Sequence, residues 1–174
     1  MRIAINGFGR VGRHITRALL EHKVKAHNAL ELIAINDLAP IKHSAHLLKY
    51  DSVYGQFRKQ ISTREDQIIV ADESIRYFSE PDPGQANWGD LNIDLILECT
   101  GCFASAEKSS SHLKAGATRV LISQPAPGVD KTIVFGVNHE TLSDSDLIIS
   151  NASCTTNCLA PLAKVINDNF EISE

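Results

Sequence analysis

The feature that most constrains the fold is a glycine-rich turn directly after the first apolar segment. Residues 3–6 have the length and apolar character of a buried strand, and Gly7-Phe8-Gly9-Arg10-Val11-Gly12 follows them without a gap. From Arg10 onward, apolar residues recur on one face of a helix. In such a turn the three glycines permit the tight bend, the close approach of a pyrophosphate and the close packing of helix on strand. The pattern predicts a strand–helix unit that binds a dinucleotide.

An acidic residue ends the second apolar run. Asp37 follows residues 32–36, which form the second predicted strand. A carboxylate at this place accepts hydrogen bonds from the adenosine ribose, and its charge repels a 2′-phosphate. The glycines alone would also suit a turn without a ligand, but strand, glycines and acid together predict NAD rather than NADP.

The rest of the chain alternates between strand-length apolar runs and helical patterns. Further strands are predicted at residues 67–70, 74–78, 93–98, 119–123, 132–137 and 147–150, and helices at residues 10–21, 44–49, 105–115 and from residue 154 onward. Residues 71–73 are expected to join a hairpin, and residues 80–92, with two prolines and two glycines, to form a loop. The alternation predicts an α/β fold, a Rossmann-type doubly wound, mostly parallel sheet with helices on both faces.

A second motif lies where the last apolar strand turns into a helix. Cys154 stands between Ser153 and Thr155, just after residues 147–150. Unpaired backbone N–H groups and the positive end of the helix dipole stabilise a thiolate there. The flanking hydroxyls add donors for an anion. The motif predicts a nucleophilic cysteine beside an anionic substrate.

Composition restricts the partners. The formal net charge is -4, with no long run of Lys or Arg, which argues against nucleic acid or an anionic membrane surface as a partner. No apolar stretch has the length of a signal peptide or a membrane span, so a cytoplasmic protein is expected. Four cysteines in 174 residues are too few for a disulfide scaffold. Reduced thiols and small-molecule ligands are therefore expected.

These motifs resemble the phosphorylating glyceraldehyde-3-phosphate dehydrogenase family. The similar segments are residues 4–10, 34–37, 46–52, 113–117 and, most specifically, 150–161. The resemblance covers essentially the whole chain and corresponds to the NAD-binding half of that family. It implies an NAD-binding Rossmann domain at residues 1–150 and the first helix of a catalytic domain at residues 151–174.

The resemblance also implies a chemistry, the glycolytic oxidation of a phosphorylated aldehyde by NAD. Cys154 would attack the aldehyde, a hydride would pass to NAD, and inorganic phosphate would release the thioester as an acyl phosphate. Ser153 and Thr155 would contribute to the phosphate site, and the family is homotetrameric. The implied cofactor-binding residues are Asn6, Gly7, Phe8, Gly9, Arg10, Val11 and Gly12 around the pyrophosphate turn, Asp37 at the ribose, Arg76, Thr100 and Gly101 at the adenine and central parts, and Ser123 toward the nicotinamide.

The chain departs from the family pattern in its histidines. The family's general base lies downstream of the nucleophile, but every histidine here lies upstream of Cys154, namely His14, His22, His27, His43, His46, His112 and His139. Each is expected to be solvated or locally hydrogen-bonded. We therefore expect the cofactor-binding portion of a dehydrogenase, with little or no turnover on its own. Its last helix should leave an apolar stripe uncovered, which favours self-association.

Other interpretations stay open at this level. Erythrose-4-phosphate dehydrogenase shares the cysteine segment, and a non-catalytic NAD-binding or redox-sensing module would use Cys154 as a low-pKa thiol. Cys99 and Cys102 could also join Cys154 and Cys158 in a zinc site, or form a thioredoxin-like pair. The zinc site is disfavoured because Cys99 closes a predicted buried strand and the flanking sequences lack the expected turns. The thioredoxin-like pair is disfavoured because no helix start with Pro follows it in the expected pattern. We expect no metal.

Overall fold

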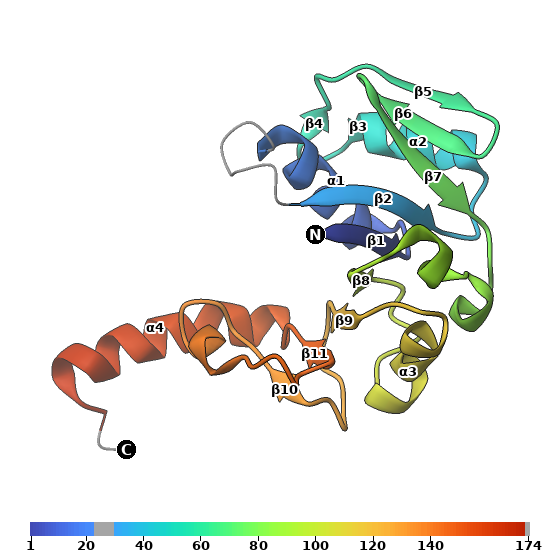
Figure 1. Cartoon of the computed structure of the whole chain (residues 1–174). Coiled ribbons are helices and arrows are strands. Elements are labelled where there is room, and N and C mark those ends of the chain that lie inside the picture. Colours follow the sequence, from blue (N-terminus) through green and yellow to red (C-terminus); the bar gives the residue numbers. More distant parts are fainter. Residues whose placement is uncertain (23–29, 173–174) are drawn as a thin grey trace.

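The computed structural model of the chain describes residues 1–22 and 30–172 (Figure 1). The described residues form a nine-stranded sheet in the order β10-β11-β9-β8-β1-β2-β7-β6-β5, and a separate pair, β3-β4. The strands are β1 (Arg2–Asn6), β2 (Glu31–Asn36), β3 (Tyr50–Asp51), β4 (Gly55–Gln56), β5 (Ile61–Arg64), β6 (Gln67–Val70), β7 (Glu73–Phe78), β8 (Leu95–Glu98), β9 (Arg119–Ile122), β10 (Lys131–Thr132) and β11 (Ile148–Ser150). The helices are α1 (Arg10–His22), α2 (Ile41–Lys49), α3 (Ala106–Lys114) and α4 (Cys154–Phe170), with short 3₁₀ helices η1 (Pro83–Gln85), η2 (Trp88–Leu91) and η3 (His139–Thr141).

The first strand lies in the interior of the sheet. β1 pairs in parallel with β2 on one side and with β8 on the other. The chain builds outward through β2 and β7, then returns to the other side of β1 for β8, β9 and β11. This reversal creates a switch point between β1 and β8, and open α/β sheets bind ligands outside the carboxyl ends of their strands at such points. The predicted Rossmann-type fold is confirmed.

Alternate residues of β1 face two different cores. Ile3 and Ile5 belong to a buried cluster that includes Leu20 of α1 and Leu48 of α2. Ala4 belongs to the opposite cluster, which is built around Trp88 and partly covered by α3. Side chains alternate along a strand, so a strand covered on both sides is apolar at nearly every position. This explains the uninterrupted apolar runs of the sequence.

Most predicted elements are confirmed, including the hairpin, in which Val70 of β6 pairs with Glu73 of β7. Two predictions were wrong. The region at residues 80–92 is not an irregular loop, because it holds η1 and η2, and its Trp88 is fully buried. The strand expected at residues 132–137 ends at Thr132, because the side chain of Asn138 accepts the N–H of Val134 (2.8 Å) and donates to the carbonyl of Thr132 (3.0 Å). The strands β3, β4 and β5 were not predicted.

The last helix, α4, extends away from the sheet (Figure 1). None of its residues 154–170, all of which the structure describes, is buried. Its exposed large apolar residues are Leu159, Leu162, Val165, Ile166 and Phe170. The expected uncovered apolar stripe is therefore present.

Candidate functional site

A cleft of about 400 Å³ opens where β1, β2, β7 and β8 end. Its lining residues, in chain order, are Asn6, Gly7, Gly9, Asn36, Asp37, Leu38, Glu80, Pro81, Cys99, Thr100, Cys102 and Phe103. Four strand ends thus contribute to one cleft at the switch point of the sheet, where a ligand is expected. The structure brings together five of the predicted cofactor residues here, namely Asn6, Gly7, Gly9, Asp37 and Thr100.

The three glycines of the turn have different surroundings. Gly7 has a φ of +94°, and a Cβ there would lie 2.6 Å from the backbone nitrogen of Thr100. A Cβ on Gly12 would lie 2.3 Å from the carbonyl oxygen of Gly7. At Gly9, by contrast, a Cβ would meet no atom within 4 Å. Gly7 and Gly12 therefore serve close packing, whereas Gly9 leaves open space at a helix N-terminus, which suits a pyrophosphate.

Asp37 is held at the rim of this turn. Its Oδ2 accepts the backbone N–H of Phe8 at 2.6 Å, and its Oδ1 accepts the N–H of Ala39 at 2.8 Å. A carboxylate has about four acceptor sites, so lone pairs remain for ribose hydroxyls. The side chain of Phe8 itself is buried in the core, and this residue contributes its backbone only.

The remaining residues predicted around the cofactor lie at the edges of the cleft or outside its lining. Arg10 and Val11 are exposed on the first turn of α1, and Gly101 lies between the lining residues Thr100 and Cys102. The backbone N–H of Ser123, after β9, donates to the carbonyl of Glu98 at 3.0 Å.

Arg76 does not line the cleft. It lies on β7, where its Nε is 3.5 Å from Asp66 Oδ2 and its guanidinium lies over the ring of Phe78. Its Cα is paired with that of Ala34, two positions before the end of β2. Pro81, which follows β7, lines the cleft instead.

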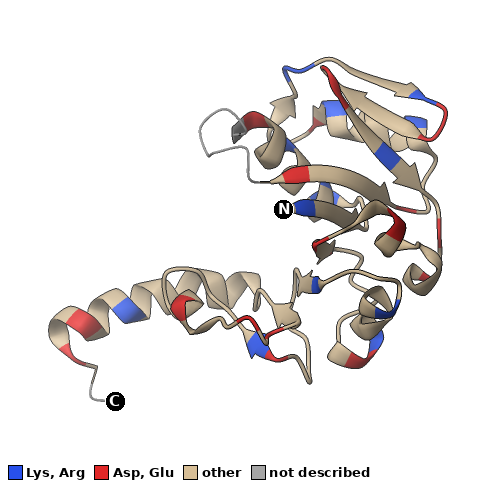
Figure 2. Cartoon of the chain, in the orientation of Figure 1, with Lys and Arg blue, Asp and Glu red and all other residues tan. Residues whose placement is uncertain are grey.

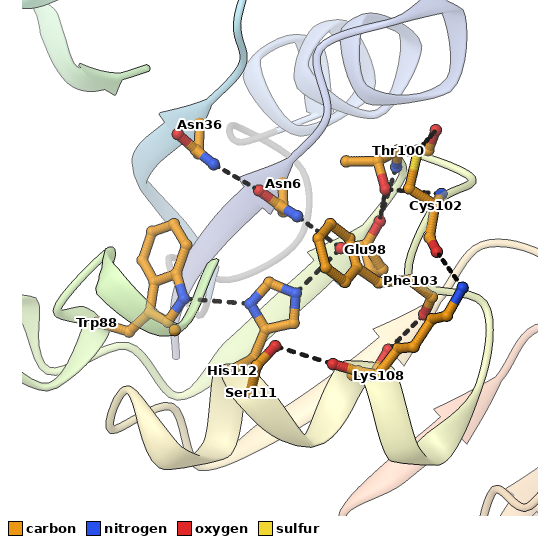
Figure 3. Close-up of polar contacts among 12 residues, drawn as sticks. Asn6, Asn36, Trp88, Glu98, Thr100, Cys102, Phe103, Lys108, Ser111 and His112 are labelled. Carbon is orange, nitrogen blue, oxygen red and sulfur yellow. Dashed lines mark hydrogen bonds and ion pairs between the residues drawn. The ribbon is translucent and has the colours of Figure 1, made fainter. Parts of the chain in front are cut away.

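The sequence did not reveal a buried polar network beneath the cleft (Figure 3). Glu98, at the end of β8, accepts hydrogen bonds from Asn6 Nδ2 (2.6 Å) and from His112 of α3 (3.0 Å) at one carboxylate oxygen. The other oxygen accepts the backbone N–H (2.7 Å) and the hydroxyl (2.5 Å) of Thr100. On the far side, Asn36 donates to Asn6 Oδ1 at 2.7 Å. The network spans β2, β1, β8 and α3.

The surroundings of Glu98 favour its ionised form. Burial raises the pKa of this carboxyl, but the hydrogen bonds from His112, Asn6 and Thr100 outweigh burial, and the pKa is lowered overall. A buried carboxylate is stable only when its oxygens are hydrogen-bonded in this way. The sequence carries one sign of this network, the charged residue Glu98 directly after the apolar residues 95–97.

The second predicted site is the start of α4. Cys154 is the first residue of the helix and is exposed, and Ser153 is its N-cap, with Oγ accepting the N–H of Thr156 at 3.0 Å. Ser153 Oγ also lies 2.9 Å from the hydroxyl of Thr155. Asn157 Nδ2 donates to the carbonyl of Asn151 at 2.7 Å and so ties the first helical turn to the preceding segment. The thiol thus lies among hydroxyls and free helix N–H groups.

The four cysteines lie in different environments, and all are free thiols. Burial raises the pKa of Cys99 to about 12, so this residue stays a neutral thiol. Cys102, Cys154 and Cys158 are exposed. Within residues 1–22 and 30–172, no group of three or more His, Cys, Asp or Glu side chains is arranged to hold a metal ion.

Among the histidines that the structure describes, two are held by carboxylates. His14 Nε2 lies 3.2 Å from Asp51 Oδ2, and hydrogen bonds from the backbone N–H groups of Tyr54 and Val53 lower the pKa of Asp51 far below its usual value. His112 is fully buried against Glu98. His27 and the side chain of His22 lie outside the described residues.

Comparison with known proteins connects these two sites. Residues 1–106 match the family model described as "Glyceraldehyde 3-phosphate dehydrogenase, NAD binding domain", and residues 153–174 match the model of its C-terminal domain. The chain belongs to the glyceraldehyde-3-phosphate dehydrogenase family. This confirms the resemblance of the sequence to that family, the presence of its NAD-binding domain and NAD as the cofactor.

Relatives within the glyceraldehyde-3-phosphate dehydrogenase family align over the full chain. The enzyme of Clostridium acetobutylicum is 51% identical over 173 residues, which are 99% of this chain and 50% of that protein. That of Xanthobacter flavus is 48% identical over 174 residues, and that of Chlamydia pneumoniae 47% over 175, each alignment covering 100% of this chain and 51% of the relative. The chain therefore spans about half the length of the curated relatives it matches.

Charged residues of both signs occur throughout the described part of this member of the glyceraldehyde-3-phosphate dehydrogenase family. Figure 2 shows acidic and basic residues interspersed along the ribbon. Within the described residues, no helix is both long enough and apolar enough to cross a membrane.

Proposed function

We propose that this chain binds NAD in the cleft at the carboxyl ends of β1, β2 and β8. The observation that carries the proposal is the pairing of open space at Gly9 with a fixed carboxylate at Asp37 on the same turn. Backbone N–H groups after β1 would hold the pyrophosphate, and Asp37 would accept the ribose hydroxyls. Thr100 and Gly101 would form the opposite wall. Arg10, Val11 and Ser123 would contact the cofactor from the edges of the cleft.

Bound NAD would supply the hydride acceptor for an aldehyde oxidation, and Cys154 would supply the nucleophile. The thiolate of Cys154 would add to the aldehyde carbon, and the N–H groups at the start of α4 would stabilise the oxyanion that forms. Loss of the hydride from that carbon leaves a thioester. Attack by inorganic phosphate then forms the acyl phosphate and returns the thiolate, with Ser153 and Thr155 donating to the phosphate.

The full reaction of the family would need more than this chain. Among the described histidines, none is hydrogen-bonded to Cys154, so none of them is placed to take the proton of its thiol. We therefore infer a chain that binds NAD and turns over a phosphorylated aldehyde slowly or not at all. We assign residues 1–150 to the NAD-binding domain, residues 151–174 to the first helix of a catalytic domain, and the cytoplasm as the compartment. The apolar stripe of α4 would promote homo-oligomers.

An NAD titration tests the cofactor site. Isothermal calorimetry should show binding to the chain, with a Kd at least about tenfold higher for Asp37→Ala, because charge-assisted hydrogen bonds to the ribose are lost. Asp72→Ala, which removes an exposed carboxylate from the β6–β7 turn, is the matched control and should bind like the wild type. Equal affinity of the Asp37 and Asp72 variants would contradict the proposed site.

Alkylation tests the nucleophile. Iodoacetamide near neutral pH should label Cys154 first and Cys99 last, because Cys99 is mostly buried and its pKa is about 12. Cys158, exposed one turn later on the same helix, is the internal control for access. Equal labelling of Cys154 and Cys158 would argue against an activated thiol. NADH formation with a phosphorylated aldehyde and phosphate then separates an enzyme from a module that only senses oxidants.

A further inference from the structure

The buried pair of His112 and Glu98 lies directly beneath the cleft and takes no part in the chemistry described above. His112 is 0% exposed and Glu98 2%. A buried histidine and a buried carboxylate are costly to maintain as mere packing, because both lose hydration. Glu98 is also hydrogen-bonded to Thr100, which lines the cleft.

The tautomer of His112 follows from its two neighbours. The indole N–H of Trp88 points at His112 Nδ1 at 3.1 Å, and an indole nitrogen can only donate. Nδ1 must therefore accept and carries no proton. The single proton of the neutral ring lies on Nε2, which donates to Glu98 Oε2 at 3.0 Å.

The same carboxylate holds the loop after β8. Glu98 Oε1 accepts both the N–H and the hydroxyl of Thr100, and Thr100 Oγ1 in turn accepts the N–H of Cys102 at 3.0 Å. Thr100 and Cys102 both line the cleft. The conformation of this wall therefore depends on a carboxylate that stays ionised and correctly oriented.

A second contact connects His112 to the cleft. Its ring packs edge-on against that of Phe103, with centroids 6.1 Å apart, and Phe103 is also a lining residue. Ser109, on the same helix, donates its hydroxyl to the carbonyl of Phe103 at 2.6 Å. Helix α3 thus holds residues 100–103 both through Glu98 and directly (Figure 3).

We propose that His112 is a positioning residue for the cofactor, which acts by donating its Nε2 proton to Glu98 and thereby fixes the Thr100 wall of the cleft. This inference rests on the proposed use of the cleft by NAD. Without the donor, Glu98 Oε2 keeps only Asn6 as a partner, and the carboxylate turns or takes up a proton. In either case the two hydrogen bonds to Thr100 weaken. The loop that carries Thr100 and Cys102 is then no longer held in one conformation before the cofactor binds.

Two amide substitutions separate this role from simple packing. In His112→Gln the amide NH₂ reaches the place of Nε2 and restores the donor to Glu98. In His112→Asn the shorter amide reaches only the place of Nδ1, so the bond to Trp88 is kept and that to Glu98 is lost. We expect the Asn variant to raise the Kd for NAD at least about tenfold, and the Gln variant to stay within about threefold of wild type.

A third variant controls for a general loss of stability in the two His112 variants. Val120 is fully buried on β9, away from the cleft lining, and Val120→Ala should lower the Tm without changing the Kd for NAD. The positioning role is overturned if the Asn variant binds NAD like the wild type, or if the Asn and Gln variants lose affinity equally. A wild-type chain that binds no NAD would instead refute the proposed function, and with it this inference.

A spectroscopic measurement on the wild type does not depend on how the variants fold. A long-range ¹H–¹⁵N spectrum of the imidazole groups should show His112 as the neutral Nε2–H tautomer in the NAD-binding chain. An Nδ1–H tautomer would overturn the proposal, because Nε2 could then not donate to Glu98.

Discussion

The chain contains two strand-to-helix turns that carry functional residues, and their surroundings differ sharply. The first, between β1 and α1, lies against the end of β8, and a Cβ on Gly7 would collide with Thr100. The second, between β11 and α4, carries the exposed Cys154 and leads into a helix with no buried residue. One strand-to-helix turn is thus packed against the core, and the other is held mainly by its own N-cap.

The difference shows that local sequence is enough to start a helix, whereas the turn after β1 also depends on residues that are distant in the sequence. Local capping suffices to begin α4, because Ser153 satisfies one of the free N–H groups. The cofactor turn needs in addition the end of β8, which is distant in the sequence. Substitutions at the first turn should therefore affect the whole domain, and those at the second should act locally.

The largest effect should come from Gly12. In Gly12→Ala the new Cβ would lie 2.3 Å from the Gly7 carbonyl, and backbone must move to admit it. We expect a loss of about 3 kcal/mol or more in the free energy of unfolding, measured by urea denaturation. The control is Gly9→Ala, which should lose less than about 1 kcal/mol while weakening NAD binding. If the two variants were equally stable, the first turn would not be locked into the core.

A smaller and pH-dependent effect is expected at Glu98. In Glu98→Gln one carboxylate oxygen becomes an NH₂ group that faces other donors, which should cost about 2 kcal/mol of unfolding free energy at pH 7. The pKa of Glu98 is lowered in the folded state, so its stabilising contribution is complete above its ordinary value of 4.5 and is lost as the pH falls through the folded-state pKa. The difference between wild type and variant should therefore shrink in urea titrations below about pH 4.5. A difference that stayed constant down to about pH 3 would show that the carboxylate is not stabilised by folding.

Two N-cap serines allow a direct comparison of the regions. Ser105 caps α3 by accepting the N–H of Lys108 at 3.2 Å, as Ser153 caps α4. Ser105→Ala should lower the global free energy of unfolding by about 1 kcal/mol, because α3 packs on the sheet. Ser153→Ala should speed hydrogen exchange in the first turns of α4 by a similar free energy and leave global unfolding unchanged. A global loss in both variants would mean that α4 folds as one unit with the sheet.

The smallest effect is expected on the exposed face of α4. Leu162→Ala should change the free energy of unfolding by less than about 0.5 kcal/mol, because this side chain is 57% exposed. Leu20→Ala, a buried residue of α1, should cost about 2 to 5 kcal/mol by the same urea assay. Sedimentation should show weaker self-association for the Leu162 variant. A loss at Leu162 comparable to that at Leu20 would place α4 in the core.

The sequence predicted what depends on local pattern. Apolar runs and caps located the central strands and all four α-helices, and the glycines with Asp37 located a turn that lines the cleft. Contacts between residues that are distant in the sequence were not predicted. Trp88 was assigned to a loop because prolines and glycines surround it, yet it is buried beneath α3. Arg76 was predicted at the cofactor, and it lies two positions before the end of β7, where it contacts Asp66 and Phe78.

The network beneath the cleft was missed for the same reason. Glu98 and His112 lie 14 residues apart, and Asn6 is 92 residues from Glu98, so no spacing rule connects them. Asn6 was predicted to contact the cofactor, and it lines the cleft, but its amide is hydrogen-bonded to Glu98 and Asn36. Only the order of strands in the sheet brings these side chains together.

The interior position of β1 also has a consequence for synthesis of the protein. Residues 2–6 leave the ribosome long before residues 95–98, which form one of their two partner strands. Until then the nascent chain carries an apolar strand with one edge unpaired, and such edges recruit chaperones or other chains. The order of translation therefore delays closure of the sheet until β8 has emerged.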